Sequence, residues 1–409
     1  MQIPKLLRRC ALTLAVCAAP MSAQEMSDMN PAGGYLMNLS SGTSQNPASW
    51  PMPMWMSQTG HWNLMFMGLA FLSDIQQSGP RGGDKLYSTN WFMAAAQHRA
   101  GPRGAFETVL MLSLEPATIT NRRYPLLFQT GETAYGQPLV DAQHPHNFIM
   151  ALGFHYAYQL GESTVLDAYI APVGDPALGP VAFPHRASAL DFPEAPISHH
   201  WQDSTHIADD VVTLGISHKK FKLESSGFHG AEPGENRWII QAGPIDSWSA
   251  RLWYFPAADW SMQVSTGRIT HPEALEPGDQ ERTTASVHYT RPLPAGGWST
   301  SLIWGRNHET AAGRNTNAYL AETLLPLTKR NYLSARFEFV DKDELFNPYI
   351  GTFPIRAYTL GFVRDIDIFR HIATGIGANF SAYTIPAAIT PYYGAHPLGG
   401  NLFLRFAAK

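Results

Sequence analysis

Residues 332–339 read YLSARFEF, in which apolar residues alternate strictly with polar ones. The polar positions are Ser334, Arg336 and Glu338. Because successive side chains of a strand point to opposite faces of a sheet, this alternation predicts a β-strand with one apolar face. Residues 260–267 show the same period of two. The pattern therefore predicts an antiparallel sheet whose two faces meet different surroundings.

Similar segments of about ten residues recur from residue 61 almost to the end of the chain. We predict about sixteen strands, near residues 61–74, 86–99, 104–116, 147–160, 163–173, 210–219, 220–229, 247–256, 259–269, 281–292, 298–308, 317–328, 331–342, 355–367, 371–384 and 399–407. Every second connection is short, and the longer ones carry most of the Pro, Asn, Asp and His residues. Short turns on one side and long loops on the other are typical of a transmembrane β-barrel.

The composition favours the same fold class. Charged residues make up only 15% of the chain, whereas aromatic residues make up 12%. Beyond residue 23 there is no run of about 18 apolar residues, so we expect no membrane-spanning helix. A soluble β-sandwich would need a filled interior, but Gly375, Gly377, Asn379 and Ser381 leave one strand face polar or very small. We therefore predict an all-β chain whose residues 61–409 form a closed antiparallel transmembrane β-barrel with long outer loops.

The segment NLFLRF, Asn401–Phe406, resembles the closing strand of bacterial outer-membrane β-barrels of the porin-like kind. In those proteins an aromatic residue ends the chain, whereas here Ala407–Lys409 follow. The resemblance covers most of the chain but depends on architecture and not on a diagnostic motif, so no characterised family is indicated. It implies a location in the cell outer membrane of a Gram-negative bacterium, contact with outer-membrane lipid and no enzymatic activity.

The residues before the barrel divide into two segments. Residues 1–23 have the basic start, apolar stretch and small-residue end of a signal peptide. Residues 24–60 are rich in Met, Pro and Ser, and we expect them to be irregular because Pro51 and Pro53 oppose a regular strand. Both cysteines, Cys10 and Cys17, fall within the signal peptide. The mature protein would therefore have no thiolate with which to bind a metal.

Two of the long connections are rich in histidine. Seven of the sixteen histidines lie between residues 129 and 210, in segments that include HPH at 144–146 and HHWQDSTH at 199–206. Neutral imidazoles and carboxylates suit Zn(II), Cu(II) or Ni(II). Neither spacing is diagnostic, and loop histidines also serve structural roles. The candidate metal ligands in these loops are His144, His146, His199, His200, Asp203 and His206.

The N-terminal segment offers a softer set of candidate ligands. Met52, Met54 and Met56 alternate with other residues and resemble the Met-x-Met clusters of periplasmic copper-handling proteins. Thioethers favour Cu(I), although methionine is also a common apolar filler. Two methionines of the first strand, Met65 and Met67, are expected to face lipid or a segment plugging the barrel.

We therefore expect a barrel that binds or passes a small solute, with copper or another transition metal as the sharper hypothesis and a periplasmic metal-handling protein as a partner. One alternative is a general porin-type barrel without a metal role. Another is a hydrolase at the barrel rim, although the chain has no G-x-S-x-G element. The net charge of −4 argues against a nucleic-acid partner. The hydrolase would depend on His199, His200, Asp203, Ser204, His206, Asp209 and Asp210.

Overall fold

The computed structural model describes residues 29–50 and 52–408, so the predicted signal peptide lies outside the described residues. The strands of the main sheet are β1 (Trp55–Thr59), β2 (Trp62–Gln77), β3 (Asp84–Tyr87), β4 (Asn90–Ala100), β5 (Gly104–Leu112), β8 (Ile149–Gly161), β9 (Thr164–Gly174), β10 (Ala208–His218), β11 (Phe221–His229), β12 (Ser247–Tyr254), β13 (Trp260–Ile269), β14 (Gln280–Leu293), β15 (Gly296–Glu309), β16 (Arg314–Thr328), β17 (Asn331–Lys342), β18 (Phe353–Asp365), β19 (Ile372–Thr384) and β20 (Leu398–Ala408).

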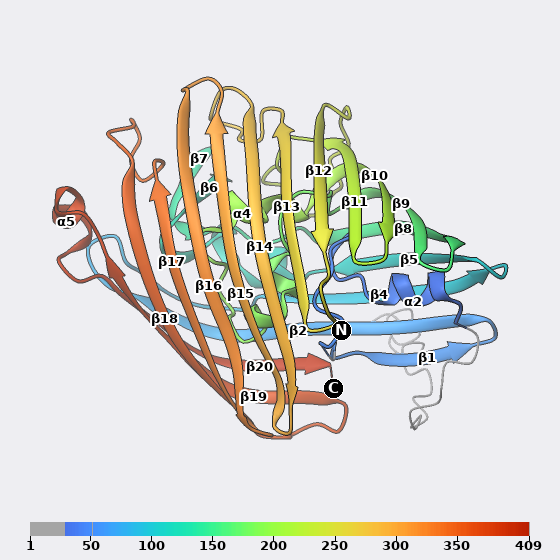
Figure 1. The fold of residues 1–409 in the computed structure, drawn as a ribbon. Helices are drawn as coiled ribbons and strands as arrows, with labels where there is room; N and C mark the ends of the chain where they lie inside the picture. The colour runs from blue at the N-terminus through green and yellow to red at the C-terminus, as the bar shows by residue number, and fades with distance from the viewer. Residues whose placement is uncertain (1–28, 51, 409) are drawn as a thin grey trace, which may run out of the picture.

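The sheet closes on itself because β20 pairs with β2 (Figure 1). The strands β1 and β20 share one edge of β2, and β3 and β4 share its other edge. The eighteen strands therefore occupy sixteen positions around the barrel, all antiparallel. Closure satisfies every strand edge, which lipid cannot do. The prediction of a sixteen-stranded antiparallel barrel is confirmed.

The two faces of the barrel are inverted relative to a soluble protein. On β14 the polar residues Thr284, Ser286 and His288 are buried, because they face the lumen. Leu302 on β15 and Leu360 on β18 are more than half exposed, at 55% and 57%. An apolar surface outside a closed barrel belongs in the hydrocarbon layer of a membrane. The alternation seen in residues 332–339 thus separates a lipid-facing side from a lumen-facing side.

Most predicted strand positions agree with the structure, but the N-terminal segment is a correction. Residues 24–60 were expected to be irregular, yet α2 (Pro31–Met37) is helical and β1 (Trp55–Thr59) pairs with β2. Asn30 accepts a hydrogen bond from the backbone N–H of Gly33 and so caps α2. The two prolines precede β1 and do not interrupt it. The strand predicted at 86–99 is divided into β3 and β4.

Residues 29–50 and 52–54, which we call the N-terminal plug, lie inside the barrel. Its helix α2 packs against β4, β5 and β8 (Figure 1). The Tyr35 hydroxyl donates a hydrogen bond to Asp167 at 2.8 Å, and Lys222 donates one to the carbonyl of Thr43 at 2.8 Å. Both wall residues lie close to the short turns, which face the periplasm in such barrels. The plug therefore fills the periplasmic end of the lumen.

Two long connections fold in from the opposite end. Loop A, residues 113–148, contains the hairpin of β6 (Tyr124–Ala134) and β7 (Gln137–Gln143) and the short helices α3 (Glu115–Thr118) and η1 (Thr120–Arg122). Loop B, residues 175–207, is almost entirely buried and contains η2 (Phe183–His185), η3 (Ala187–Ala189), α4 (His199–Gln202) and η4 (Ser204–His206).

Loop B is attached to the lumen wall by charged contacts. The Arg186 guanidinium donates to Glu322 on β16 at 2.5 Å, and Ser198 donates to Glu338 on β17 at 2.8 Å. Because buried charges need partners, these pairs hold the loop in one position. The connection after β19 forms a further outer loop with η5 (Ala387–Ile389) and α5 (Thr390–Tyr393). Among the described residues, none of the helices has the length and apolar character needed to cross a membrane.

Candidate metal centre

Loops A and B meet in the lumen and bring five of the predicted histidines together, and we call this group the histidine cluster. The ring centroid of His206 lies 5.2 Å from that of His199 and 5.4 Å from that of His146. His200 lies 5.3 Å from His199 and 6.1 Å from His144. Two imidazoles on one tetrahedral ion have centroids roughly 5 Å apart, given metal–nitrogen bonds of about 2.0 Å. Three of the four distances, 5.2–5.4 Å, fit such ligand pairs, and they are also the distances of edge-to-face ring packing.

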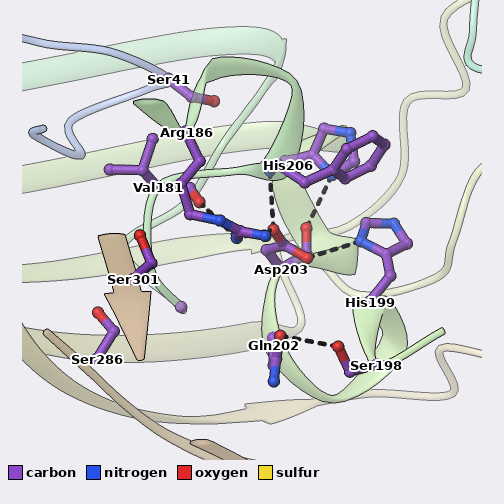
Figure 2. Close-up of polar contacts among 12 residues, drawn as sticks. Ser41, Val181, Arg186, Ser198, His199, Gln202, Asp203, His206, Ser286 and Ser301 are labelled. Carbon is purple, nitrogen blue, oxygen red and sulfur yellow. Dashed lines mark hydrogen bonds and ion pairs between the residues drawn. The ribbon is translucent and has the colours of Figure 1, made fainter. Parts of the chain in front are cut away.

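Asp203 organises the centre of the cluster (Figure 2). One carboxylate oxygen accepts from Nδ1 of His199 at 2.7 Å, and the other accepts from Arg186 at 2.9 Å. Its backbone carbonyl accepts from Nδ1 of His206 at 2.8 Å. The side chain also accepts from the backbone N–H of Phe183 at 2.8 Å. In this arrangement Asp203 orients His199 and His206, and its predicted role as a direct ligand stays a prediction.

The same arrangement recurs around the cluster. Nδ1 of His146 faces Glu115 at 3.0 Å, and Nδ1 of His144 faces the carbonyl of Pro145 at 3.2 Å. An acceptor on Nδ1 fixes the tautomer and leaves Nε2 free to bind a metal. Nε2 of His206 is buried and has no hydrogen-bond partner among the described residues. The imidazoles of His146, His199 and His206 are thus held in the orientation that supporting groups give to metal-bound histidines, whereas Nε2 of His144 faces Glu132 at 3.1 Å.

His200 lies where two further loops approach. Its Nδ1 is 3.6 Å from Glu232 and 3.6 Å from Glu273, and the three ligand atoms lie within 4.8 Å of one another. Within the described part of the chain, neither ring nitrogen of His200 has a hydrogen-bond partner. A buried imidazole without partners costs free energy unless something else satisfies it. This trio is therefore the part of the cluster best arranged to hold an ion.

The ionisation of these groups fits the same chemistry. Burial lowers the pKa of His206 well below its ordinary value, and it lowers that of His199 to about 4 despite the opposing effect of Asp203. These imidazoles are therefore neutral near pH 7, which is their metal-binding form. Burial and then the neighbouring Glu273 raise the pKa of Glu232 well above its ordinary value. A bound cation would relieve that repulsion.

An acidic cavity of about 460 Å³ lies beside this site, and we call it the vestibule. Glu273 lines it and also lies 3.6 Å from His200, so the vestibule and the histidine cluster are adjacent. One basic residue, Arg314, lies among its acidic groups and pairs with Asp343 at 2.6 Å. The excess of carboxylates attracts cations. The acidic lining residues are Glu132, Glu273, Glu276, Glu309, Asp343 and Glu344.

Two of the predicted methionines, Met52 and Met54, line a cavity that His206 of the histidine cluster also lines, whereas Met56 lies on β1. Met56 is opposite Met65 in the β1–β2 pairing, and Met52 and Met54 are half-buried against the lumen wall. A second cavity, of about 40 Å³, separates the plug from this wall, and we call it the methionine chamber. It also contains His185 and His206. Its methionines are Met37, Met52, Met54, Met65, Met67, Met93 and Met111.

The sequence therefore identified the five histidines and Asp203, whose roles as ligands stay predictions, but it did not identify their carboxylate neighbours. Glu232 lies after β11 and Glu273 after β13, each surrounded by ordinary polar loop residues. Glu132 pairs with both His144 and Arg237. No spacing in the chain connects these positions. The only signal was that each lies in a connection on the outer side of the barrel.

The hydrolase alternative receives little geometric support. Ser204, its only candidate nucleophile, accepts a hydrogen bond from Arg282 at 2.8 Å. Asp210 accepts from the backbone N–H of Gly243 at 2.8 Å. A catalytic serine needs a base within hydrogen-bond reach. Ser204 meets a guanidinium there, and a guanidinium cannot accept its proton.

Comparison with known proteins identifies similar folds. An anion-selective porin from Comamonas acidovorans superposes with a TM-score of 0.54 at 11% identity, covering 85% of this chain and 99% of the porin. Salmonella typhi OmpF in complex with daunomycin superposes with a TM-score of 0.55 at 9% identity, covering 86% of this chain and 100% of OmpF. In-vitro folded OmpT, an outer membrane protein of Vibrio cholerae, superposes with a TM-score of 0.50 at 7% identity, covering 86% of this chain and 99% of OmpT.

No protein-family model matches the chain, and no curated protein matches it by sequence. Identities this low show a shared fold alone. Together with the closed barrel and its apolar exterior, they confirm the predicted resemblance and location: the chain is an outer-membrane β-barrel with the sixteen-stranded architecture of bacterial porins.

Proposed function

We propose that this outer-membrane barrel binds transition-metal ions in its lumen and passes them toward the periplasm, with copper as the preferred cargo. The histidine cluster carries the proposal: five imidazoles lie together, four of them buried, and four have their Nδ1 atoms held by acceptors. Neutral imidazole with carboxylate is the ligand set that suits Cu(II), Zn(II) and Ni(II). Buried structural histidines would instead use both ring nitrogens in hydrogen bonds.

We propose two binding positions. His200 with Glu232 and Glu273 forms the outer position, next to the vestibule. His199 and His206 form a deeper one through their Nε2 atoms, with Asp203 as their positioning residue. Several adjacent positions of moderate strength are what conduction requires, because an ion must leave each as readily as it enters. A periplasmic metal-handling protein would receive the ion at the plugged end.

Metal titration of the purified, detergent-solubilised protein tests this proposal. We expect Co(II) and Cu(II) to bind, with the spectroscopic signature of nitrogen ligands. His200→Asn should lower the affinity roughly 10- to 100-fold, as loss of a metal-supporting group does. His396→Asn is the control, because His396 is exposed in an outer loop. Equal binding by the wild type and His200→Asn, with both correctly folded, would overturn the proposal.

A second candidate is porin-type passage of small cations without metal selectivity. The vestibule of about 460 Å³ favours it, because its acidic lining attracts any cation. The Comamonas porin is described as anion-selective, and this lining would give the opposite preference. Bilayer conductance separates the candidates: a general pore keeps its conductance in His200→Asn, whereas a metal pathway loses metal-dependent current. We propose no catalytic role.

A further inference from the structure

The lumen wall beside the plug presents methionines in register on three adjacent strands. Met67 on β2 is directly opposite Met93 on β4, and Met93 is directly opposite Met111 on β5. All three are buried, with at most 9% of each exposed. Neighbouring strands lie about 4.8 Å apart. The three thioether side chains are therefore carried side by side on the wall, and all three line the methionine chamber.

Loop B adds an imidazole to this row. Nε2 of His185 lies 3.1 Å from Sδ of Met111, and its ring packs on Trp91 with centroids 4.4 Å apart. Metal bonds of about 2.0 Å to nitrogen and about 2.3 Å to sulfur span this 3.1 Å at roughly a right angle. The two atoms thus already lie at the separation of neighbouring ligands on one ion.

The surroundings of this row are specialised. Seven of the chain's fourteen methionines line the methionine chamber. A core that needed only apolar filling would be expected to use Leu, Ile and Phe more than Met. The cavity of about 40 Å³ is large enough for one ion, since a water needs only about 10–15 Å³. His206 lines the chamber as well as belonging to the histidine cluster, so the two sites adjoin.

We infer that Met67, Met93, Met111 and His185 form a second metal site that binds a soft monovalent ion, Cu(I) or Ag(I). Thioethers select such ions, whereas harder divalent ions prefer the imidazoles and carboxylates of the outer position. The inference deepens the proposed function by giving the pathway an inner position of different selectivity. The methionine site would bind ions that enter the barrel already monovalent, and divalent ions would bind only at the imidazole positions, so no bound ion changes its oxidation state within the barrel.

Silver binding tests the inference, because Ag(I) is not reduced or oxidised under assay conditions. We expect the purified full-length protein to bind Ag(I) with sulfur scatterers in its X-ray absorption spectrum. Met93→Leu/Met111→Leu conserves the volume of the wall and should lower the affinity roughly 10- to 100-fold. Met262→Leu is the control, because Met262 lines an apolar groove on the outside of the barrel.

The result separates this inference from the proposed function. His200→Asn should lose Co(II) binding and keep Ag(I) binding, and the double methionine variant should show the reverse. Ag(I) bound through nitrogen and oxygen alone, or unchanged binding in a folded double variant, would overturn the methionine site while leaving the histidine site standing. Heat-modifiable migration on a denaturing gel confirms that each variant is a folded barrel.

Discussion

The histidine cluster and the methionine chamber adjoin within one lumen, yet they are built differently. The cluster takes its side chains from four outer connections, two of which contribute only Glu232 and Glu273. The chamber takes its central row from the register of β2, β4 and β5. The loops carry the imidazoles and carboxylates of the cluster, whereas three wall strands present the methionines at the fixed spacing of a sheet. Hard and soft ligands thus occupy the elements that suit them.

The largest expected effect comes from Arg186, which supports both sites. It pairs with Asp203 and Glu322, and it belongs to the loop that carries His185. Arg186→Leu would leave the buried Asp203 without its guanidinium partner and Glu322 with Arg336 as its one remaining cation, at a cost of about 3–5 kcal/mol. We expect loop B to leave the lumen, bilayer conductance to rise and binding of both Co(II) and Ag(I) to be lost. Arg186→Lys should be milder, and a stable Arg186→Leu variant with normal binding would contradict this account.

A second variant should affect the outer site alone. Glu232→Gln/Glu273→Gln removes the two carboxylates nearest to Nδ1 of His200. We expect Co(II) affinity to fall roughly 10- to 100-fold and Ag(I) affinity to stay the same. Calorimetric titration with each ion measures both. A parallel fall in silver binding would show that the two sites are not independent.

A smaller effect is expected at Gly131, whose backbone lies against His200. A Cβ there would lie 2.3 Å from Cε1 of His200, and φ is +106°. Gly131→Ala should therefore displace the ring and lower Co(II) affinity about tenfold. Gly136→Ala is a matched control, because its φ is +70° but nothing lies within 4 Å of the added atom. Equal losses in both variants would assign the effect to backbone strain and not to His200.

The smallest expected effect concerns access to the methionine chamber. Tyr35→Phe removes the hydrogen bond from the plug to Asp167, which is worth about 1 kcal/mol. The plug should open more often, and Ag(I) should bind about fivefold faster at nearly unchanged affinity. Stopped-flow mixing with silver measures the rate. A rate unaffected by this change would show that ions enter by another route.

Much of the fold could be predicted, because period-two alternation is a local property. The alternation in residues 332–339 alone identifies the face of β17 that meets lipid, because it does not depend on which strands lie beside β17. The helix α2 was missed because its sequence, PAGGYLM, contains two glycines that disfavour an isolated helix. Packing against β4, β5 and β8 stabilises it instead.

The candidate site was predictable only in part. The histidines stood out because HPH and HHWQDSTH are unusual, but Glu273 looked like any loop carboxylate. Its distance of 3.6 Å to His200 joins positions 73 residues apart, and it depends on how the barrel closes. Likewise, Met67, Met93 and Met111 are scattered in the chain, and only the strand register makes them neighbours.

The sequence by itself determined the sixteen-stranded outer-membrane barrel, because the alternation of apolar and polar residues and the spacing of turns are local properties of the chain. The tertiary structure alone decided what the lumen contains. Loops A and B and the plug enter it because buried pairs such as Arg186–Glu322 hold them there. Those pairs, the carboxylates beside His200 and the methionine row all join residues far apart in the chain. Such contacts depend on barrel closure and register, which no local pattern encodes.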